Sequence, residues 1–146
     1  MNANGPGVPD LLRRFTPTPH SVRVSFRQFE ISLQTNDAEL AVAMELAGEP
    51  RTNDRQGLLL LARIIRDYEA PEDSSQLTLL SHGPLLTLLL GTGTMLTMDC
   101  GRRELMGFLA PAVPTQRVLD ELLPLLLDRL SDAAASTNRT QMQTHR

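Results

Sequence analysis

Residues 77–98 constrain the fold more than any other stretch, because they are strongly apolar and contain no Asp, Glu, Arg or Lys. About 20 apolar residues can cross a bilayer as a helix. Here, however, Gly83-Pro84 and Gly91-Thr92-Gly93 interrupt the stretch, and such residues break a helix. Basic or aromatic anchors are also missing close to its ends. The stretch therefore predicts short buried strands joined by turns, and not a membrane span.

The glycines at 91 and 93 also match part of a dinucleotide-binding loop. The third glycine of that motif is replaced by Leu96, and no helix is predicted to follow. All 14 basic residues of the chain are arginines. A Walker A loop and Schiff-base chemistry both need a lysine, so the sequence excludes them. A hairpin turn is the preferred interpretation of residues 91–93.

Composition excludes further classes of protein. The net charge is −3 and no basic stripe is present, which argues against binding to nucleic acid. Aromatic residues make up 3% of the chain, so the core must be aliphatic. Cys100 is the single cysteine, which rules out an intrachain disulfide and favours a reducing compartment. The first residues lack the pattern of a secretory signal, and we expect a cytoplasmic protein.

Alternation of apolar and polar residues predicts strands at the start of the ordered region. Val22, Val24 and Phe26 alternate with polar residues, and the alternation then resumes one position out of phase from Phe29. The change of phase predicts a bulge or a tight hairpin at Arg27-Gln28. Further strands are expected at 76–81, 85–90, 94–98 and 104–109, as an antiparallel meander. Residues 58–68 suit either a strand or a helix, and we prefer a strand.

Two helices are predicted. Asn36 begins the first in the manner of a capping box with Glu39, and the helix should end at about residue 47, before Gly48 and Pro50. The second spans 115–131 and is amphipathic and rich in leucine. Pro124 should kink it.

These elements predict one α+β domain over residues 20–130, with an antiparallel β-meander sheet. Residues 1–19 are expected to form a flexible leader rich in proline and glycine, in which residues 11–15 are the part able to dock on the domain. Residues 131–146 are expected to be a disordered polar tail, because they have too little apolar surface to repay ordering.

No group of residues in the sequence has the spacing of a catalytic or metal site. The histidines at 20, 82 and 145 are too scattered for a metal. His82 could approach Asp99 or Cys100 in a meander, although a solvent-facing histidine is the preferred reading. Arg102 and Arg103 could lower the pKa of Cys100, but an incidental cysteine is again preferred. We therefore expect no enzyme activity, metal or cofactor.

Two segments resemble a known family. FEISLQTND at 29–37 and GTGTMLTMDCGRRELMGFLA at 91–110, each followed by a predicted helix, resemble the small N-terminal region of HPr-kinase-like proteins. In those proteins this non-catalytic region precedes a P-loop domain. The resemblance implies an accessory module without the kinase domain, because this chain has no P-loop motif.

The meander is apolar on both faces, and two helices are too few to cover both. This predicts a non-catalytic interaction or regulatory module, either a homodimer or a subunit of a complex. The alternative is a domain that binds a small apolar ligand in an aliphatic pocket, with Arg102 and Arg103 contacting an anionic group at its mouth. The leucines expected at the interaction surface are Leu86, Leu88, Leu90, Leu119, Leu123 and Leu126.

Overall fold

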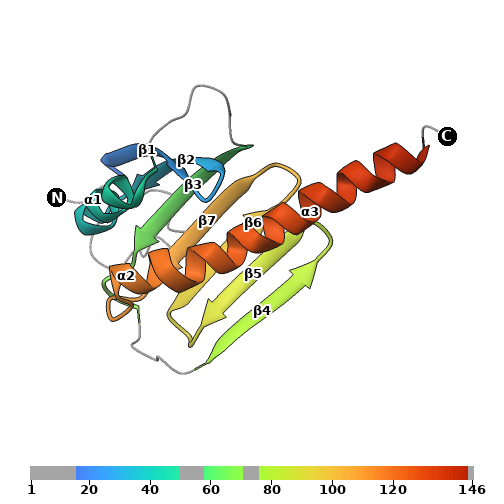
Figure 1. Ribbon diagram of the computed structural model, residues 1–146. Coiled ribbons are helices and arrows are strands. Elements are labelled where there is room, and N and C mark those ends of the chain that lie inside the picture. Colours follow the sequence, from blue (N-terminus) through green and yellow to red (C-terminus); the bar gives the residue numbers. More distant parts are fainter. Residues whose placement is uncertain (1–15, 50–57, 71–75, 145–146) are drawn as a thin grey trace.

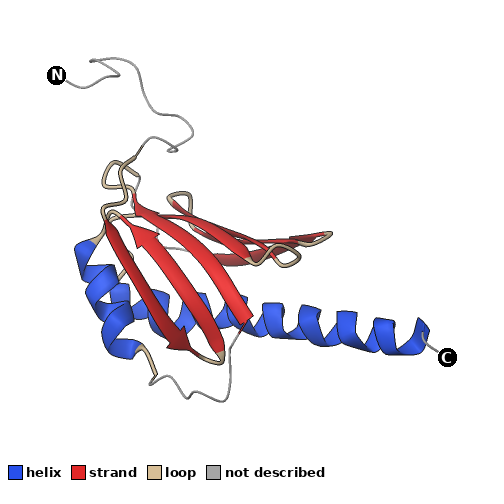
Figure 2. Cartoon of the chain, turned by 90° about the horizontal axis from the view of Figure 1, so that it is seen from above, coloured by secondary structure: helices blue, strands red, loops and turns tan. Residues whose placement is uncertain are grey.

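The computed structural model describes residues 16–49, 58–70 and 76–144, the side chains being described as far as residue 133. It shows one seven-stranded sheet with the order β1-β2-β3-β7-β6-β5-β4. Helices pack on one face of this sheet (Figures 1 and 2). The α+β class predicted from the sequence is confirmed. The strands are β1 (His20–Phe26), β2 (Phe29–Thr35), β3 (Leu58–Arg66), β4 (Leu77–His82), β5 (Leu85–Leu90), β6 (Thr94–Asp99) and β7 (Glu104–Leu109).

The first two strands form a hairpin with a two-residue turn. Phe26 pairs with Phe29, and the turn residues Arg27 and Gln28 have φ of 49° and 71°. Positive φ at both central residues matches the right-handed twist of the strands that the turn joins. The change of phase in the sequence is therefore a tight hairpin, one of the two predicted alternatives.

Helix α1 (Ala38–Ala47) connects β2 to β3, and these two strands are parallel. Its N-cap is Asp37, whose Oδ1 accepts hydrogen bonds from the backbone N–H groups of Glu39 and Leu40 at 3.0 and 3.3 Å. The predicted cap at Asn36 is thus wrong by one residue. Asn36 instead bonds to the backbone of Arg66 on β3. The preference for a strand at residues 58–68 is confirmed by β3.

The four strands from β4 to β7 form the predicted antiparallel meander. The chain crosses from β3 to the far edge of the sheet and returns strand by strand. β7 then lies parallel to β3, so the sheet is mixed at its centre. Within the described residues, no helix is long and apolar enough to span a membrane.

The C-terminal helical region differs from the prediction in two ways. It comprises α2 (Thr115–Arg117), the π-helix η1 (Val118–Leu122) and α3 (Leu123–Thr144). First, a π-helical turn lies directly before Pro124, where the sequence predicts a kink. This wider turn leaves room for the proline ring, which would crowd a carbonyl of the preceding turn in a regular α-helix. The helix also continues beyond residue 131, so the expected tail is helical as far as Thr144. Alanines at 133–135 favour this extension once the helix has formed.

The core lies between the sheet and the helices. It contains all six leucines that were expected to form an interaction surface, with exposed fractions between 0% and 6%. That expectation is wrong, because side chains from β5 and α3 bury one another within the same chain. Residues 1–15 of the predicted leader lie outside the described residues. The six buried residues are Leu86, Leu88, Leu90, Leu119, Leu123 and Leu126.

Gly107 on β7 provides a test of this packing. A Cβ at this position would collide with the side chain of Leu96, which is fully buried on the neighbouring strand. We expect Gly107→Ala to lower the free energy of unfolding by about 1–3 kcal/mol, because a packed core has no room for an added methyl group. Urea unfolding would measure the change. Gly101→Ala, where the nearest atom is 3.4 Å away in an exposed turn, should change stability by less than about 0.5 kcal/mol.

Candidate functional site: the open face of the sheet

The described helices leave one face of the sheet open (Figure 2). Alternation along the strands points a mixed set of apolar and polar side chains to this open face. Five large apolar residues on it are substantially exposed, with polar and charged residues between them, and they are available for contact with a partner. They are Leu59 at 36%, Leu61 at 48%, Leu80 at 52%, Leu85 at 40% and Met95 at 42%.

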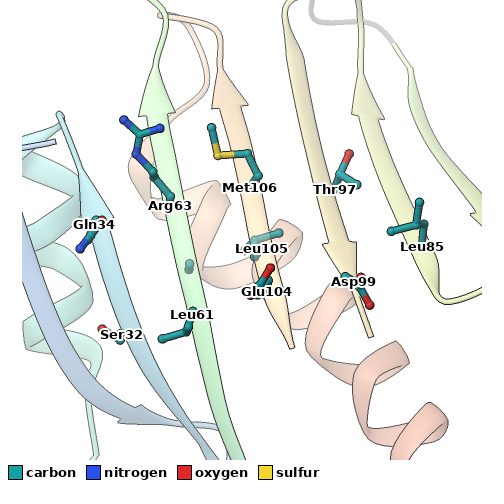
Figure 3. Close-up of a pocket in the computed structure, with 11 residues that line it drawn as sticks. Ser32, Gln34, Leu61, Arg63, Leu85, Thr97, Asp99, Glu104, Leu105 and Met106 are labelled. Atoms are coloured by element: carbon teal, nitrogen blue, oxygen red, sulfur yellow. The ribbon is translucent and has the colours of Figure 1, made fainter. Parts of the chain in front are cut away.

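A hollow of about 420 Å³ lies in this open face, across the middle strands. Strands β2, β3, β7, β6 and β5 all contribute to it, as Figure 3 shows. Leu61 and Leu85 provide apolar walls, whereas Arg63 on β3 and Glu104 on β7 provide opposite charges. The hollow is therefore amphipathic. The lining also includes Ser32, Gln34, Thr97, Asp99 and Met106.

Two carboxylates lie opposite each other in the hollow. Asp99 on β6 is the register partner of Glu104 on β7, and like charges at such positions repel. Asp99 Oδ1 accepts hydrogen bonds from the N–H groups of Gly101 and Arg102, at 2.9 and 3.1 Å, which offsets part of its charge. This arrangement gives the hollow an acidic side that suits a cationic group.

The basic side of the hollow is Arg63. Its Nη2 donates a 2.6 Å hydrogen bond to the carbonyl oxygen of Thr16, in the segment that precedes β1. The chain therefore passes over the open face before it enters the sheet. Among the described residues, no cluster of His, Cys, Asp or Glu could hold a metal ion. The apolar and charged side chains that line the hollow are suited to contact with another molecule.

The arginines predicted to contact an anion lie elsewhere. Arg102 and Arg103 are exposed in the turn between β6 and β7, and neither lines the hollow. His82 is exposed and aligns with Leu85, which in turn aligns with Asp99. One whole strand thus separates His82 from Asp99, so the suggested pair does not form.

Cys100 is partly buried in the same turn. Burial raises the pKa of the Cys100 thiol, and the negative charge of Asp99 raises this pKa further. The suggestion that Arg102 and Arg103 lower it is therefore wrong. The thiolate is the reactive form, so the environment of Cys100 suppresses nucleophilic chemistry at neutral pH.

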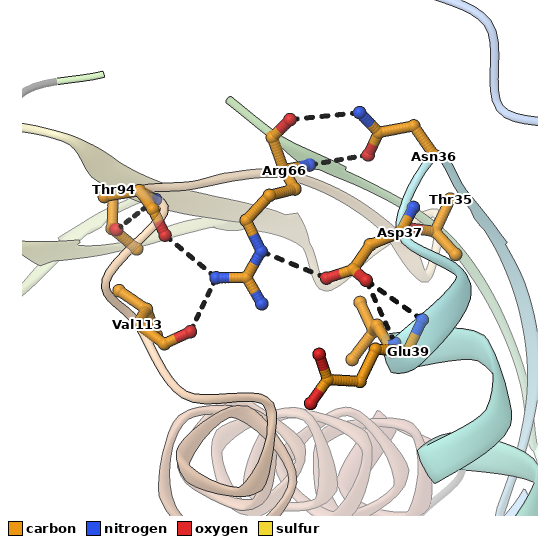
Figure 4. Close-up of polar contacts among 9 residues, drawn as sticks. Thr35, Asn36, Asp37, Glu39, Arg66, Thr94 and Val113 are labelled. Atoms are coloured by element: carbon orange, nitrogen blue, oxygen red, sulfur yellow. Dashed lines mark hydrogen bonds and ion pairs between the residues drawn. The ribbon is translucent and has the colours of Figure 1, made fainter. Parts of the chain in front are cut away.

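A second polar cluster lies at the carboxyl ends of the parallel strands β2, β3 and β7 (Figure 4). Arg66 Nε donates to Asp37 Oδ2 at 3.0 Å, and the two side chains are 5% and 8% exposed. Arg66 Nη1 donates to the carbonyl oxygens of Ala110 and Val113, at 2.8 and 2.6 Å. Asn36 completes the cluster by pairing with the backbone N–H and C=O of Arg66, at 2.7 and 3.0 Å.

Ligands often bind at the carboxyl ends of parallel strands, so this cluster deserves comparison with a binding site. Its groups already bond to one another, and the described residues contain no buried side-chain nitrogen or oxygen without a partner. The cluster therefore joins β2, β3, α1 and the segment before α2. We assign it a structural role.

Sequence reasoning missed both of these groups. Arg63 and Arg66 lie within residues 58–68, for which the sequence predicts only a strand or a helix, and Glu104 is the first residue of a predicted strand. Because β3 and β7 are separated by three strands in sequence, their pairing could not be foreseen. A signal for Arg66 did exist, since a charged residue that ends an otherwise apolar strand needs a buried partner.

The chain matches no family model, no curated protein and no solved structure in the comparisons with known proteins. The resemblance of residues 29–37 and 91–110 to HPr-kinase-like proteins therefore stays a prediction.

The environment of Cys100 predicts slow alkylation. At pH 7 the raised pKa leaves less thiolate than in a free cysteine, so iodoacetamide should react more slowly with Cys100 than with a small thiol, and faster as the pH rises. Asp99→Asn should increase the rate by removing one cause of the raised pKa. Asp128→Asn, on an exposed part of α3, should leave the rate unchanged. A wild-type rate equal to that of the small thiol would contradict the assignment.

The ion pair between Arg66 and Asp37 predicts a large loss of stability when one partner is removed. Arg66→Met should lower the free energy of unfolding by about 3–5 kcal/mol, because Asp37 would keep a buried charge without its cation. Chemical denaturation would measure the loss. Arg23→Met breaks the exposed pair with Glu30, 2.9 Å apart, and should cost less than about 1 kcal/mol. Equal losses in the two variants would refute the structural role.

Proposed function

We propose that this protein is a non-catalytic interaction or regulatory module, either a homodimer or an accessory subunit, that binds its partner on the open face of the sheet. The observation that carries the proposal is the exposure of Leu61, Leu80, Leu85 and Met95 on that face. We place its action in the cytoplasm, in keeping with the single cysteine. A role without catalysis also fits the resemblance to the accessory region of HPr-kinase-like proteins.

The chemistry of the open face supports a protein partner. A protein interface combines apolar contacts with polar groups that fix the orientation of the partner, and the hollow offers both. Leu61 and Leu85 supply apolar contacts at its two sides, and Glu104 and Asp99 lie between them in register. Arg63 lies two residues from Leu61 on β3 and adds a cation. A two-fold homodimer could place the Arg63 side of one subunit opposite the Glu104 side of the other, because such an interface uses the same surface twice.

Self-association gives the first test. We expect light scattering at micromolar concentration to show a particle larger than the monomer. Leu85→Glu should weaken this association at least about tenfold, because the interface would have to bury a carboxylate. A stable interface buries about 1,200–2,000 Å², so the open face would have to be largely covered in the dimer.

Leu46→Glu is the matched control, because Leu46 is 82% exposed on α1, away from the open face. Its association should equal that of the wild type. A wild-type monomer at all accessible concentrations would exclude the homodimer and leave the accessory subunit. Equal binding of a captured partner by wild type and Leu85→Glu would then refute the open face as the docking site.

The alternative is a small-molecule binding domain, and the hollow is the observation that favours it. Its volume of about 420 Å³ falls within the range of about 300–1,000 Å³ that is usual for ligand pockets. In a small-molecule binding domain, Arg63 would contact the anionic group of the ligand, because Arg63 lines the hollow and Arg102 and Arg103 do not. Native mass spectrometry of the purified protein would detect a retained ligand, which Arg63→Met should release.

A further inference from the structure

Strand β4 (Leu77–His82) ends the sheet, and no described segment pairs with its outer side. Figure 1 shows this side free of any described helix or strand. The residues of β4 pair one for one with β5, so no bulge twists the edge away. None of them is Asp, Glu, Arg, Lys or Pro, the residues that commonly protect an open edge. The edge at β4 is therefore able to accept a further strand.

The free hydrogen-bonding groups of β4 belong to alternate residues. The N–H of Gly91 donates to the carbonyl oxygen of Gln76 at 3.2 Å, which continues the ladder between β4 and β5 by one step. Since bonded and non-bonded pairs alternate in an antiparallel ladder, the even-numbered residues of β4 bond to β5. The backbone N–H and C=O groups that point outward are therefore those of Leu77, Leu79 and Ser81.

The opposite edge of the sheet, at β1, is protected in two ways. The carbonyl oxygen of Ser25 accepts a 2.7 Å hydrogen bond from the N–H of Glu49, which follows α1. Arg23, at the middle of β1, has a side chain that is 57% exposed. A second copy of β1 centred there would place two arginines opposite each other, and like charges in such positions repel. Of the two edges, β4 is thus the one that tolerates a copy of itself.

The sequence of β4 is complementary to its own copy. In an antiparallel arrangement around a two-fold axis at Leu79, the two Leu79 residues face each other and Leu77 faces Ser81. All of these residues point their backbone groups outward, so each pair can exchange two hydrogen bonds. Gln76, the residue before β4, would face His82. No two charged side chains of the same sign therefore oppose each other.

The same arrangement would bury apolar surface. Leu77 and Leu79 are half-buried and pack against the margin of the core. Their partners on β5, Leu90 and Leu88, are buried, so these side chains lie on the helical side of the sheet. Contact between two copies of Leu79 would complete this apolar layer.

We propose that two copies of this chain join edge to edge through β4, as antiparallel strands around a two-fold axis at Leu79. This inference goes beyond the proposed function, because the contact lies at the edge of the sheet and not on its open face. The axis is perpendicular to the sheet, so the helices of both copies lie on one side. The two open faces then form one continuous surface, which stays free for a partner.

Opposite charges at residue 79 test the pairing in the full-length chain. Sedimentation velocity at micromolar concentration and above should show a wild-type dimer. Leu79→Lys and Leu79→Glu should each weaken association at least about fivefold, because each variant places two like charges at the axis. An equimolar mixture of the two variants should associate at least about fivefold more tightly than either alone, because unlike charges then face each other. Circular dichroism would confirm that each variant is folded.

Ser81→Pro is a second variant that acts on the backbone. It removes an outward N–H and leaves the bonds between β4 and β5 in place, and its side chain is exposed, so association should weaken while the fold is kept. Val42→Lys is the matched control, because Val42 is 56% exposed on α1, away from β4. Its association should equal that of the wild type.

Three results would overturn the edge pairing: a wild-type monomer at every concentration, wild-type association of Leu79→Lys, or a mixture that associates no better than its components. Leu85→Glu should keep the edge dimer, because Leu85 lies on the open face. Association that is lost in Leu85→Glu and kept in Leu79→Lys would refute the edge and retain an open-face homodimer. The opposite pattern would support the edge and refute that homodimer, so the two proposals fail separately.

Discussion

The ion pair between Arg66 and Asp37 is the interaction on which the arrangement of the other elements depends. It lies where β2, β3 and β7 end side by side, and one guanidinium bonds to Asp37 and to the carbonyl oxygens of Ala110 and Val113. These partners belong to the start of α1 and to the segment before α2. A single buried cation therefore connects the end of β3 to the segments where both helical regions begin. Because each buried group has a partner, the cost of removing these charges from water is offset.

That anchoring places the helices on one face and leaves the other face to the solvent. Helix α3 crosses β7, β6 and β5 on the helical side (Figure 1), and its buried leucines belong to the same core cluster as the inward side chains of these strands. On the open side, apolar residues alternate with Arg63, Asp99 and Glu104 instead of forming a continuous apolar layer. Such a surface is too polar to be a core and too apolar to be an ordinary exterior, which is why we connect the function of the protein with it.

Much of the fold could be predicted from local patterns. The strands of the meander, the hairpin at Arg27-Gln28 and the amphipathic helix near residue 119 follow from the period of the apolar residues and from turn chemistry, both of which act over a few residues. The candidate site could not be predicted in this way. Its walls come from five strands, and the six leucines chosen as a surface proved to be core because β5 and α3 face each other.

The sequence by itself determined that the chain has an aliphatic α+β core, lacks lysine-dependent chemistry and breaks its most apolar stretch into turns. These properties depend on residue type and local conformation alone. Only the tertiary structure decided which face of the sheet is covered and that β3 pairs with β7. It also decided that Arg63 donates a hydrogen bond to Thr16 and that Arg66 forms an ion pair with Asp37. These pairings join residues about 30 to 50 positions apart, and they arise from packing the whole sheet against its helices, which no local pattern encodes.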